Sequence, residues 1–361
     1  MKVLHLTSGL LFGGGLERVI VDLMTRRIGK SSYLCVINDQ WDKKHLDELD
    51  RDLVLLCNRK IGTQNPIITL SILCRIYKFI KTNNIKIIHC HNSFSLKFGY
   101  LIKKVLKVKV IFTVHDTNAY YKELNKYPVD KYIAVSQSVY KNVKKYVPED
   151  KIEVIYNGVD LKRFINASKY HEKNSKSFNI ACVARIMPEK KGQDILIKAL
   201  SILKKQYKYE NFKCFFAGAI HNQESMDELI KLIKKLDLER NIQFMGNVEQ
   251  IEKLYANTNV FVLPSRYEGF GLVVVEALAS GCKVIVSKLD GPLEIIKENQ
   301  EYGLYFEKEN YEELAEKLYL LTQNVDCNKE YSDSRKILEY LKQDYSLEKM
   351  VERYDEVYRE V

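Results

Sequence analysis

Glu268 and Glu276 lie on either side of the expected start of a helix, where two carboxylates could do chemistry. An apolar strand ends at Pro264, two glycines follow in the segment 265–276, and the helix begins near Leu272. A helix N-terminus stabilises negative charge by about 0.3–1 kcal/mol, so this end suits a diphosphate. The carboxylates beside it suit the hydroxyls of a sugar or a ribose. The residues alone leave a second interpretation open, in which both are ordinary surface and helix-dipole charges.

A second glycine-rich turn, Gly13-Gly14-Gly15, follows the first predicted strand and opens a helix. Glycines let the backbone approach an anion, and the helix start offers N–H groups to it. With Gly9 the spacing still departs from the dinucleotide fingerprint, and no acidic residue clearly ends the next strand to hold a ribose. The turn therefore indicates either an anion site or a tight structural turn.

Continuous apolar strand segments alternate with amphipathic helical segments along the chain. Strands of this kind are buried on both faces, which predicts parallel sheets covered by helices on both sides. Strands are predicted at residues 3–7, 33–38, 53–57, 85–91, 109–115, 132–135, 178–184, 213–217, 242–245, 260–264 and 283–287. Helices are predicted at residues 16–27, 67–82, 95–107, 193–206, 226–236, 251–256, 272–280 and 346–361.

The β/α rhythm breaks at 166–177, a polar stretch without apolar periodicity, and then restarts. A chain of 361 residues also favours two domains. We therefore expect an N-terminal domain over 1–165, a linker over 166–177, a second domain over 178–345 and a final helix over 346–361. Sheets of this type bind ligands at the carboxyl ends of their strands, so we expect a ligand in the cleft between the two domains.

The formal net charge of +10 is compatible with nucleic acid, a membrane surface or an anionic small molecule as partner. No pattern of a nucleic-acid module is present, which argues against nucleic acid. The eight cysteines are scattered and form no C-x-x-C pair, so we expect buried, reduced thiols. The N-terminus is too short and polar for a signal peptide, and no apolar run approaches the ~20 residues of a membrane span. We expect a cytosolic protein.

Several ordered motifs resemble those of the retaining family-4 glycosyltransferases. The E-x7-E segment from Glu268 to Glu276 resembles the signature of that family, and the similarity covers nearly the whole chain. The resemblance implies an α/β chain with the GT-B fold: two Rossmann-like domains with parallel sheets facing a central cleft, and a C-terminal helix that returns to the N-terminal domain. The further segments that carry it are Gly14-Gly15-Leu16-Glu17, Ile87-Ile88-His89-Cys90-His91, Thr113-Val114-His115-Asp116, Asn157-Gly158-Val159-Asp160 with Phe164, and residues 184–192.

The resemblance also implies roles for single residues. His115 would sit over the donor sugar, Glu268 would hold the sugar hydroxyls, and Glu276 would hold the ribose. Arg185 and a lysine would bind the diphosphate, Arg as a fork and Lys as a point charge. Lys190 and Lys191 both fit that place, and Lys191 is favoured because it precedes Gly192. The backbones that would approach the phosphates are those of Gly14, Gly15, Phe270, Gly271 and Leu272.

Two patterns could suggest a metal, and we expect neither to bind one. Asp50-Arg51-Asp52 resembles a two-Asp cation site, but it lies in the wrong domain and such short patterns are common. His89 and His91 have ligand-like spacing, yet we place their side chains on opposite faces of a strand. The cations Arg185 and Lys191, with a helix dipole, can replace a metal. We therefore expect no cofactor and no metal.

The expected reaction moves a hexosyl or N-acetylhexosaminyl unit, with retention, from a nucleotide-diphosphate sugar, UDP being favoured, to a glycan or lipid-linked acceptor. Capsule, exopolysaccharide or other surface polysaccharide synthesis is the expected setting. The basic, apolar segment 97–109, with lysines in 139–147, predicts peripheral attachment to the inner face of the plasma membrane. A solvated helix face is the other interpretation. A nucleotide-sugar epimerase, a phosphorylase or a non-catalytic scaffold on the same fold are the alternative functions.

Overall fold

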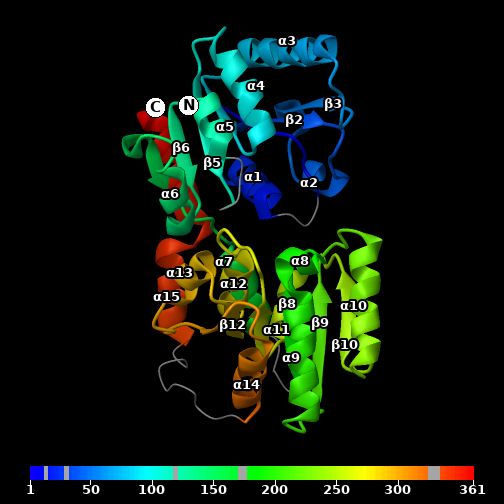
Figure 1. Ribbon diagram of the computed structural model, residues 1–361. Coiled ribbons are helices and arrows are strands. Elements are labelled where there is room, and N and C mark those ends of the chain that lie inside the picture. Colours follow the sequence, from blue (N-terminus) through cyan, green and yellow to red (C-terminus); the bar gives the residue numbers. More distant parts are fainter. Residues whose placement is uncertain (12–14, 28–31, 117–120, 170–176, 324–333) are drawn as a thin grey trace. The chain divides into compact units, whose positions relative to one another are not determined.

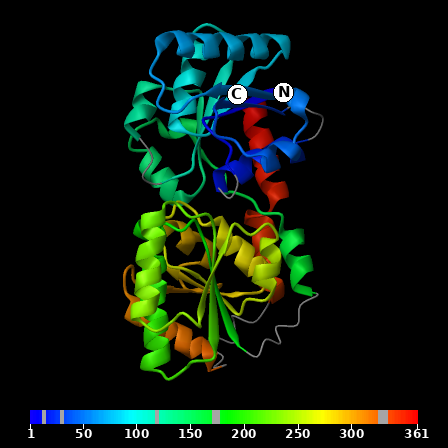
Figure 2. The ribbon, with the colours of Figure 1, turned by 90° about the vertical axis from the view of Figure 1, so that its right-hand side faces the viewer.

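The computed structural model describes residues 1–11, 15–27, 32–116, 121–169, 177–323 and 334–361. The chain forms two compact units, which are described separately (Figures 1 and 2). The first unit contains Met1–Gly158 and Leu347–Val361, and the second contains Val159–Ser346. Each unit is built around one parallel sheet, as expected for two Rossmann-like domains.

The first unit has a seven-stranded parallel sheet with the order β3-β2-β1-β4-β5-β6-β7. Every residue of β1 is buried, as a central strand covered on both faces requires. The strands are β1 (Val3–Thr7), β2 (Ser32–Asn38), β3 (Val54–Arg59), β4 (Ile87–Cys90), β5 (Lys109–Val114), β6 (Lys131–Ala134) and β7 (Ile152–Val154). The helices are α1 (Gly15–Arg26), α2 (Lys43–Asp47), α3 (Pro66–Thr82), α4 (Ser93–Lys103), α5 (Tyr121–Lys126), α6 (Gln137–Val143) and α16 (Leu347–Glu360), with 3-10 turns η1 (Arg51–Leu53) and η2 (Glu149–Lys151).

The second unit has a six-stranded parallel sheet with the order β10-β9-β8-β11-β12-β13. A buried apolar cluster packs α9 and α14 on the sheet, with Leu200, Phe216 and Leu318 among its members. The strands are β8 (Phe178–Val183), β9 (Phe212–Ala217), β10 (Ile242–Gly246), β11 (Val260–Leu263), β12 (Lys283–Ser287) and β13 (Leu304–Phe306). The helices are α7 (Leu161–Lys169), α8 (Pro188–Lys191), α9 (Gln193–Lys205), α10 (Gln223–Lys235), α11 (Ile251–Ala256), α12 (Leu272–Ala279), α13 (Asp290–Ile296), α14 (Tyr311–Thr322) and α15 (Ser334–Asp344).

The return of the C-terminal helix to the first unit is confirmed, because α16 belongs to the same compact unit as β1. The boundary between the units differs from the expected one and lies between Gly158 and Val159. Helix α7 belongs to the second unit, where Phe164 meets the ring of Tyr255 at a centroid distance of 5.9 Å. The predicted linker therefore begins inside a helix, and its residues 170–176 lie outside the described part of the chain.

The cysteine expectation is correct for most thiols and wrong for Cys74, which is exposed on α3. The buried, unbridged cysteines are Cys35, Cys57, Cys90, Cys182, Cys214 and Cys282. Cys327 lies outside the described residues. Within the described ranges, no helix combines the length and the apolar character needed to cross a membrane.

Candidate active site

Two loops of the second unit meet at the carboxyl ends of β8 and β11. Gly192, between α8 and α9, has φ +64°, and a Cβ there would lie 1.9 Å from the carbonyl oxygen of Pro264. The N–H groups of Arg266 and Tyr267 donate to the carbonyl oxygen of Lys190 at 2.8 and 3.2 Å. Only glycine permits this backbone approach, because any side chain at 192 would push the two loops apart.

Arg266 joins the same two loops through its side chain. Its guanidinium donates to both carboxylate oxygens of Asp194, at 2.7 and 2.9 Å, and to the carbonyl oxygen of Pro188 at 2.5 Å. It also reaches both oxygens of Glu309, at 2.7 and 2.8 Å. Burial by itself would raise the pKa of Asp194, but the paired guanidinium outweighs it and the net pKa is lowered. Arg266 could not be selected from the sequence, because its partners Asp194 and Glu309 lie 72 and 43 residues away.

Lys191 and Glu268 come together between these loops. The Lys191 Nζ lies 2.9 Å from Glu268 Oε2, and the two side chains are 26% and 17% exposed. Lys190 is exposed and contributes its backbone oxygen to the loop contact described above. The structure therefore pairs Lys191, and not Lys190, with the carboxylate of Glu268. Arg185 is exposed just after β8, and its carbonyl oxygen accepts a hydrogen bond from Gln193 Nε2 at 2.9 Å.

The helix α12 begins as expected, immediately after Gly271. Gly271 has φ +99° and is the N-cap residue, so Leu272 is the first residue of the helix. Phe270 is buried, with its ring 5.7 Å from that of Tyr345. The three predicted backbone donors thus surround one helix N-terminus, where the helix dipole favours an anion.

Glu276 is held by a residue that sequence reasoning missed. The hydroxyl of the buried Tyr255 donates to Glu276 Oε2 at 3.1 Å. Burial and the nearby negative charge of Glu276 raise the pKa of Tyr255, so the hydroxyl keeps its proton as a donor. Because Tyr255 lies on α11 and Glu276 on α12, this contact fixes the carboxylate against a neighbouring helix.

The remaining predicted site residues belong to the first unit. Gly15 is the first residue of α1, while Gly13 and Gly14 lie outside the described residues. His115 follows β5 and is half-buried, and burial lowers its pKa to about 3. The imidazole of His115 is therefore neutral at neutral pH.

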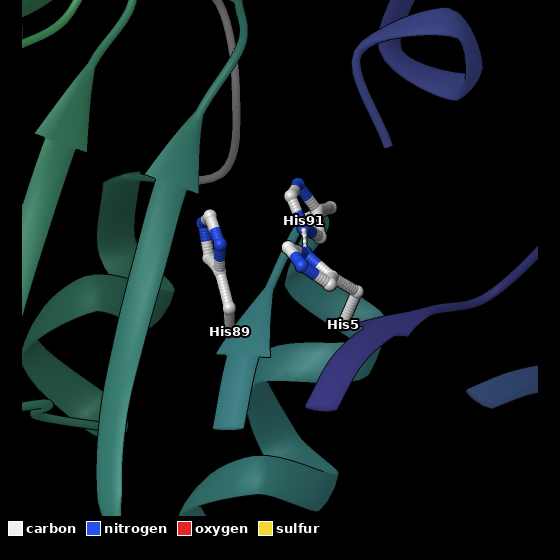
Figure 3. Close-up of side chains that lie close together, drawn as sticks. All are labelled: His5, His89 and His91. Carbon is white, nitrogen blue, oxygen red and sulfur yellow. Dashed lines mark hydrogen bonds between the residues drawn. The ribbon is translucent and has the colours of Figure 1, made fainter. Parts of the chain in front are cut away.

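Three further histidines lie beside His115, and their arrangement corrects one expectation. His5 on β1 and His89 on β4 are register partners in the sheet, and the rings of His89 and His91 are 4.0 Å apart (Figure 3). His89 and His91 therefore point to one side, not to opposite faces. The expectation was wrong because side chains two positions apart on a strand share a face.

The C-terminal helix α16 covers this histidine cluster. The hydroxyl of Tyr358 lies 2.6 Å from His89 Nδ1, and Thr113 Oγ1 lies 2.7 Å from His89 Nε2. The hydroxyl of Tyr354 reaches Thr113 Oγ1 at 3.1 Å. Burial is the main cause that lowers the pKa values of His5, His89 and His91 well below the usual range. All three rings are neutral at neutral pH.

Neutral imidazoles are potential metal ligands. Among the described residues, three ring nitrogens lie within 4.8 Å of one another, one each from His5, His89 and His91. Both nitrogens of His89, however, already contact hydroxyl groups. Asp50 is the N-cap of η1 and accepts from the N–H of Asp52 at 3.2 Å. That contact gives the aspartate pattern a structural role.

Two parallel-sheet Rossmann-like units, with a C-terminal helix that returns to the first unit, define the GT-B class of proteins. Comparison with known families agrees: residues 164–345 match the model described as glycosyl transferases group 1, and residues 13–163 match glycosyltransferase family 4. The chain belongs to this family of group 1, family-4 glycosyltransferases.

Several individual proteins are similar to this chain, at 20–30% sequence identity. An uncharacterised glycosyltransferase of Methanocaldococcus jannaschii is 29% identical over 63% of this chain and 64% of its own length. The capsular polysaccharide biosynthesis glycosyltransferase CapM of Staphylococcus aureus is 30% identical over 52% of this chain and 50% of its own. These matches thus span half to two thirds of each relative. The structure of HepE from Anabaena, solved with UDP, superposes over 100% of both chains with a TM-score of 0.83 at 20% identity, which shows a shared fold.

Proposed function

We propose that this chain is a retaining, metal-independent glycosyltransferase. It moves a hexosyl or N-acetylhexosaminyl unit from a nucleotide-diphosphate sugar to a glycan or lipid-linked acceptor in the synthesis of capsule or another surface polysaccharide. The observation that carries the proposal is the Lys191–Glu268 pair at 2.9 Å, in which Glu268 lies in the loop that leads into α12. A UDP-sugar is the favoured donor, since the structurally similar HepE was solved with UDP.

The second unit supplies the donor-binding groups in this proposal. The diphosphate binds at the N-terminus of α12, where the N–H groups of residues 270–272 and the cations Arg185 and Lys191 offset its charge. Glu276, held by Tyr255, accepts hydrogen bonds from the ribose. Glu268 accepts hydrogen bonds from the sugar. The ion pair with Lys191 holds the carboxylate of Glu268 in place before the donor binds.

The first unit supplies His115, which contributes a hydrogen bond to the donor sugar during transfer. The sugar–phosphate bond breaks, the acceptor hydroxyl bonds to the anomeric carbon from the same face, and the leaving phosphate accepts the proton of that hydroxyl. Neither Glu268 nor Glu276 acts as a nucleophile. A covalent glycosyl-enzyme trapped on any side chain would contradict this step.

We propose that a membrane contact lies on α3, in addition to the predicted segment 97–109. In the segment 97–109, Phe98 and Ile102 are buried and Lys103 is paired with Asp130 at 2.6 Å, whereas Val105 is 73% exposed. On α3, Ile67 and Leu70 are 75% and 62% exposed. The basic segment thus offers to solvent its exposed lysines and the single apolar side chain of Val105, fewer exposed apolar groups than α3.

We propose that this outer side of α3 binds an anionic membrane surface. Residues Ile67, Leu70, Cys74 and Tyr77 are exposed at helical spacing, and the exposed Lys78 and Lys81 lie at the same end as Tyr77. Apolar side chains next to lysines are the composition that inserts into the headgroup region of an anionic bilayer. The attachment would hold the protein at the inner face of the plasma membrane, near lipid-linked acceptors.

The purified full-length protein should be screened with UDP-, GDP- and dTDP-sugars for an increase in thermal unfolding temperature, because a bound donor stabilises the folded state. The stabilising donor is then incubated with lipid-linked and soluble glycan acceptors. Acceptor-dependent transfer supports the proposal. Release of a changed nucleotide sugar without acceptor would indicate an epimerase, and donor binding without any turnover would indicate a scaffold.

A further inference from the structure

We propose that His5, His91 and His115 form a hydrogen-bonded chain of three imidazoles that places the ring proton of His115 on Nδ1. His5 and His91 are then positioning residues for His115. The proposal rests on the proposed function only for the role of His115 in transfer, since the chain itself is a property of the first unit.

The three rings are joined nitrogen to nitrogen. His5 Nδ1 lies 3.0 Å from His91 Nε2, and His91 Nδ1 lies 3.4 Å from His115 Nε2. The planes are inclined by only 27° in the first pair and 30° in the second (Figure 3 shows His5 and His91). The chain starts inside β1, passes the end of β4 and finishes in the loop after β5.

Proton counting links the three rings. A neutral imidazole carries one N–H and one lone pair, so His91 can donate to one neighbour and must accept from the other. The chain therefore has two directions. Either every ring donates toward His115, or every ring donates toward His5.

The far end of the chain decides between the two directions. His5 Nε2 is fully buried, and among the described residues it has no hydrogen-bond partner. If every ring donated toward His5, this atom would be a buried N–H without an acceptor. A buried N–H without a partner is rarer and costs more free energy than a buried lone pair without one. If every ring donates toward His115, His5 Nε2 carries no hydrogen and has only a lone pair without a donor. The geometry points to His5 as donor to His91, and to His91 as donor to His115.

This direction gives His115 a defined chemistry. Its Nε2 lone pair accepts from His91, so its proton is on Nδ1, and the nitrogen that His91 does not contact is a hydrogen-bond donor. His115 then has no lone pair left for a proton from the acceptor. A donor at His115 agrees with a reaction in which the leaving phosphate takes that proton.

A metal at the same histidines is the competing arrangement. A metal ion would be coordinated by a nitrogen lone pair of His5 and one of His91. In the imidazole chain, the same two rings instead share one proton in a hydrogen bond. It would also require His89 to give up one hydroxyl contact, with Tyr358 or with Thr113. The imidazole chain requires neither change.

The test is ¹⁵N NMR of the full-length protein labelled at histidine, since protonated and unprotonated ring nitrogens differ widely in chemical shift. His115 is assigned from its loss in His115→Asn. The wild type should show His115 with the proton on Nδ1 only. His5→Leu should turn this signal into a mixture of tautomers, whereas His5→Asn, whose amide N–H can replace the lost donor, should preserve it. His45→Leu, a change at a buried histidine outside the chain, should leave the signal unchanged.

A proton on Nε2 of His115 in the wild type, or an unchanged His115 in His5→Leu, would overturn the proposal. So would one equivalent of zinc retained by protein purified without chelator. If His5→Leu does not fold, the wild type and His5→Asn decide the question. In transfer assays His5→Leu should lower kcat about fivefold, as expected for one weakened hydrogen bond, with an unchanged KM for the donor. The NMR result stands even if no transfer is found, which separates this proposal from the proposed function.

Discussion

The Lys191 ammonium and the Glu268 carboxylate form an ion pair at 2.9 Å although 77 residues separate them in the sequence. The pair is formed because Gly192 lets the loop after β8 contact the loop after β11, and Arg266 of the second loop binds Pro188 of the first. A basic and an acidic donor-binding group are thereby placed before any ligand arrives. Their mutual distance is a property of the second unit alone.

Glu268→Gln should lower kcat/KM by roughly 10- to 150-fold, because a hydrogen bond to a charged group contributes about 1.5–3 kcal/mol. The fold should remain intact, since the amide occupies the same volume. Steady-state kinetics with the donor identified by screening measure the effect. Glu307→Gln removes an ion pair with Lys288 elsewhere in the second unit and serves as the control. Equal activity of the two variants would contradict the assigned site.

Gly192→Ala and Gly246→Ala compare two glycines with almost the same φ, +64° and +63°. An alanine at 246 meets no atom within 4 Å, so it should cost only the penalty of about 1–2 kcal/mol for a left-handed backbone conformation. An alanine at 192 also collides with Pro264. We expect a clearly larger loss of stability and loss of donor binding at 192, measured by denaturant unfolding and calorimetric titration. Similar losses in both variants would show that the loop contact is unimportant.

Tyr255→Phe should weaken donor binding by about fivefold, because it removes the hydroxyl that holds Glu276 and keeps the ring that packs on Phe164. The KM for the donor should rise, while kcat should change little. Tyr209→Phe, a change at a tyrosine of the same unit far from α12 in the sequence, provides the comparison. A fall in kcat with an unchanged donor KM would assign Glu276 to the reacting sugar instead of the ribose.

Arg266→Met should destabilise the second unit in a pH-dependent way. The folded-state pKa of Asp194 is lowered. Its contribution is therefore complete above the unfolded pKa of about 3.9 and disappears as the pH falls through the lower folded value. The difference in unfolding free energy between wild type and variant should be constant from pH 8 to pH 5 and shrink below about pH 4. A difference that grows in acid would exclude the Asp194 pair as its source.

Ile67→Ser with Leu70→Ser should abolish co-sedimentation with vesicles that contain anionic phospholipid. Each substitution removes an exposed apolar side chain from α3, so stability should be almost unaffected. Leu320→Ser removes a 39% exposed leucine of the second unit and should bind vesicles normally. Binding by the double variant that is lost only at high salt would indicate an electrostatic contact through lysines such as Lys97 instead.

The β/α alternation could be predicted from the sequence because buried strands and amphipathic helices leave a local pattern. Short elements such as β7 and β13 were missed, since three residues are too few for periodicity to show. The boundary was misplaced because the polar α7 resembles a linker, while its contact with Tyr255 is nonlocal.

In the candidate site too, contacts between residues distant in the sequence could not be predicted. Glu268 and Glu276 could be selected from their motif, but their partners on other elements could not. Tyr255 lies 21 residues from Glu276, and Tyr358 lies 269 residues from His89. Such contacts follow from the packing of helices and leave no trace in local spacing. The side on which His91 lies could have been predicted from strand geometry alone.

Helix α16 has a consequence for the order in which the two units can complete their folding. Domains generally fold from the N-terminus during synthesis. His89 and Thr113, however, contact the hydroxyls of Tyr358 and Tyr354, which are synthesised only after the whole second unit. While the second unit is being translated, the first unit exists with one face of its histidine cluster uncovered. A ribosome that stops before residue 347 would thus release a chain that still holds the Lys191–Glu268 pair, yet lacks the tyrosines behind His89. The synthesis of α16 therefore decides when the histidine cluster of the first unit is covered.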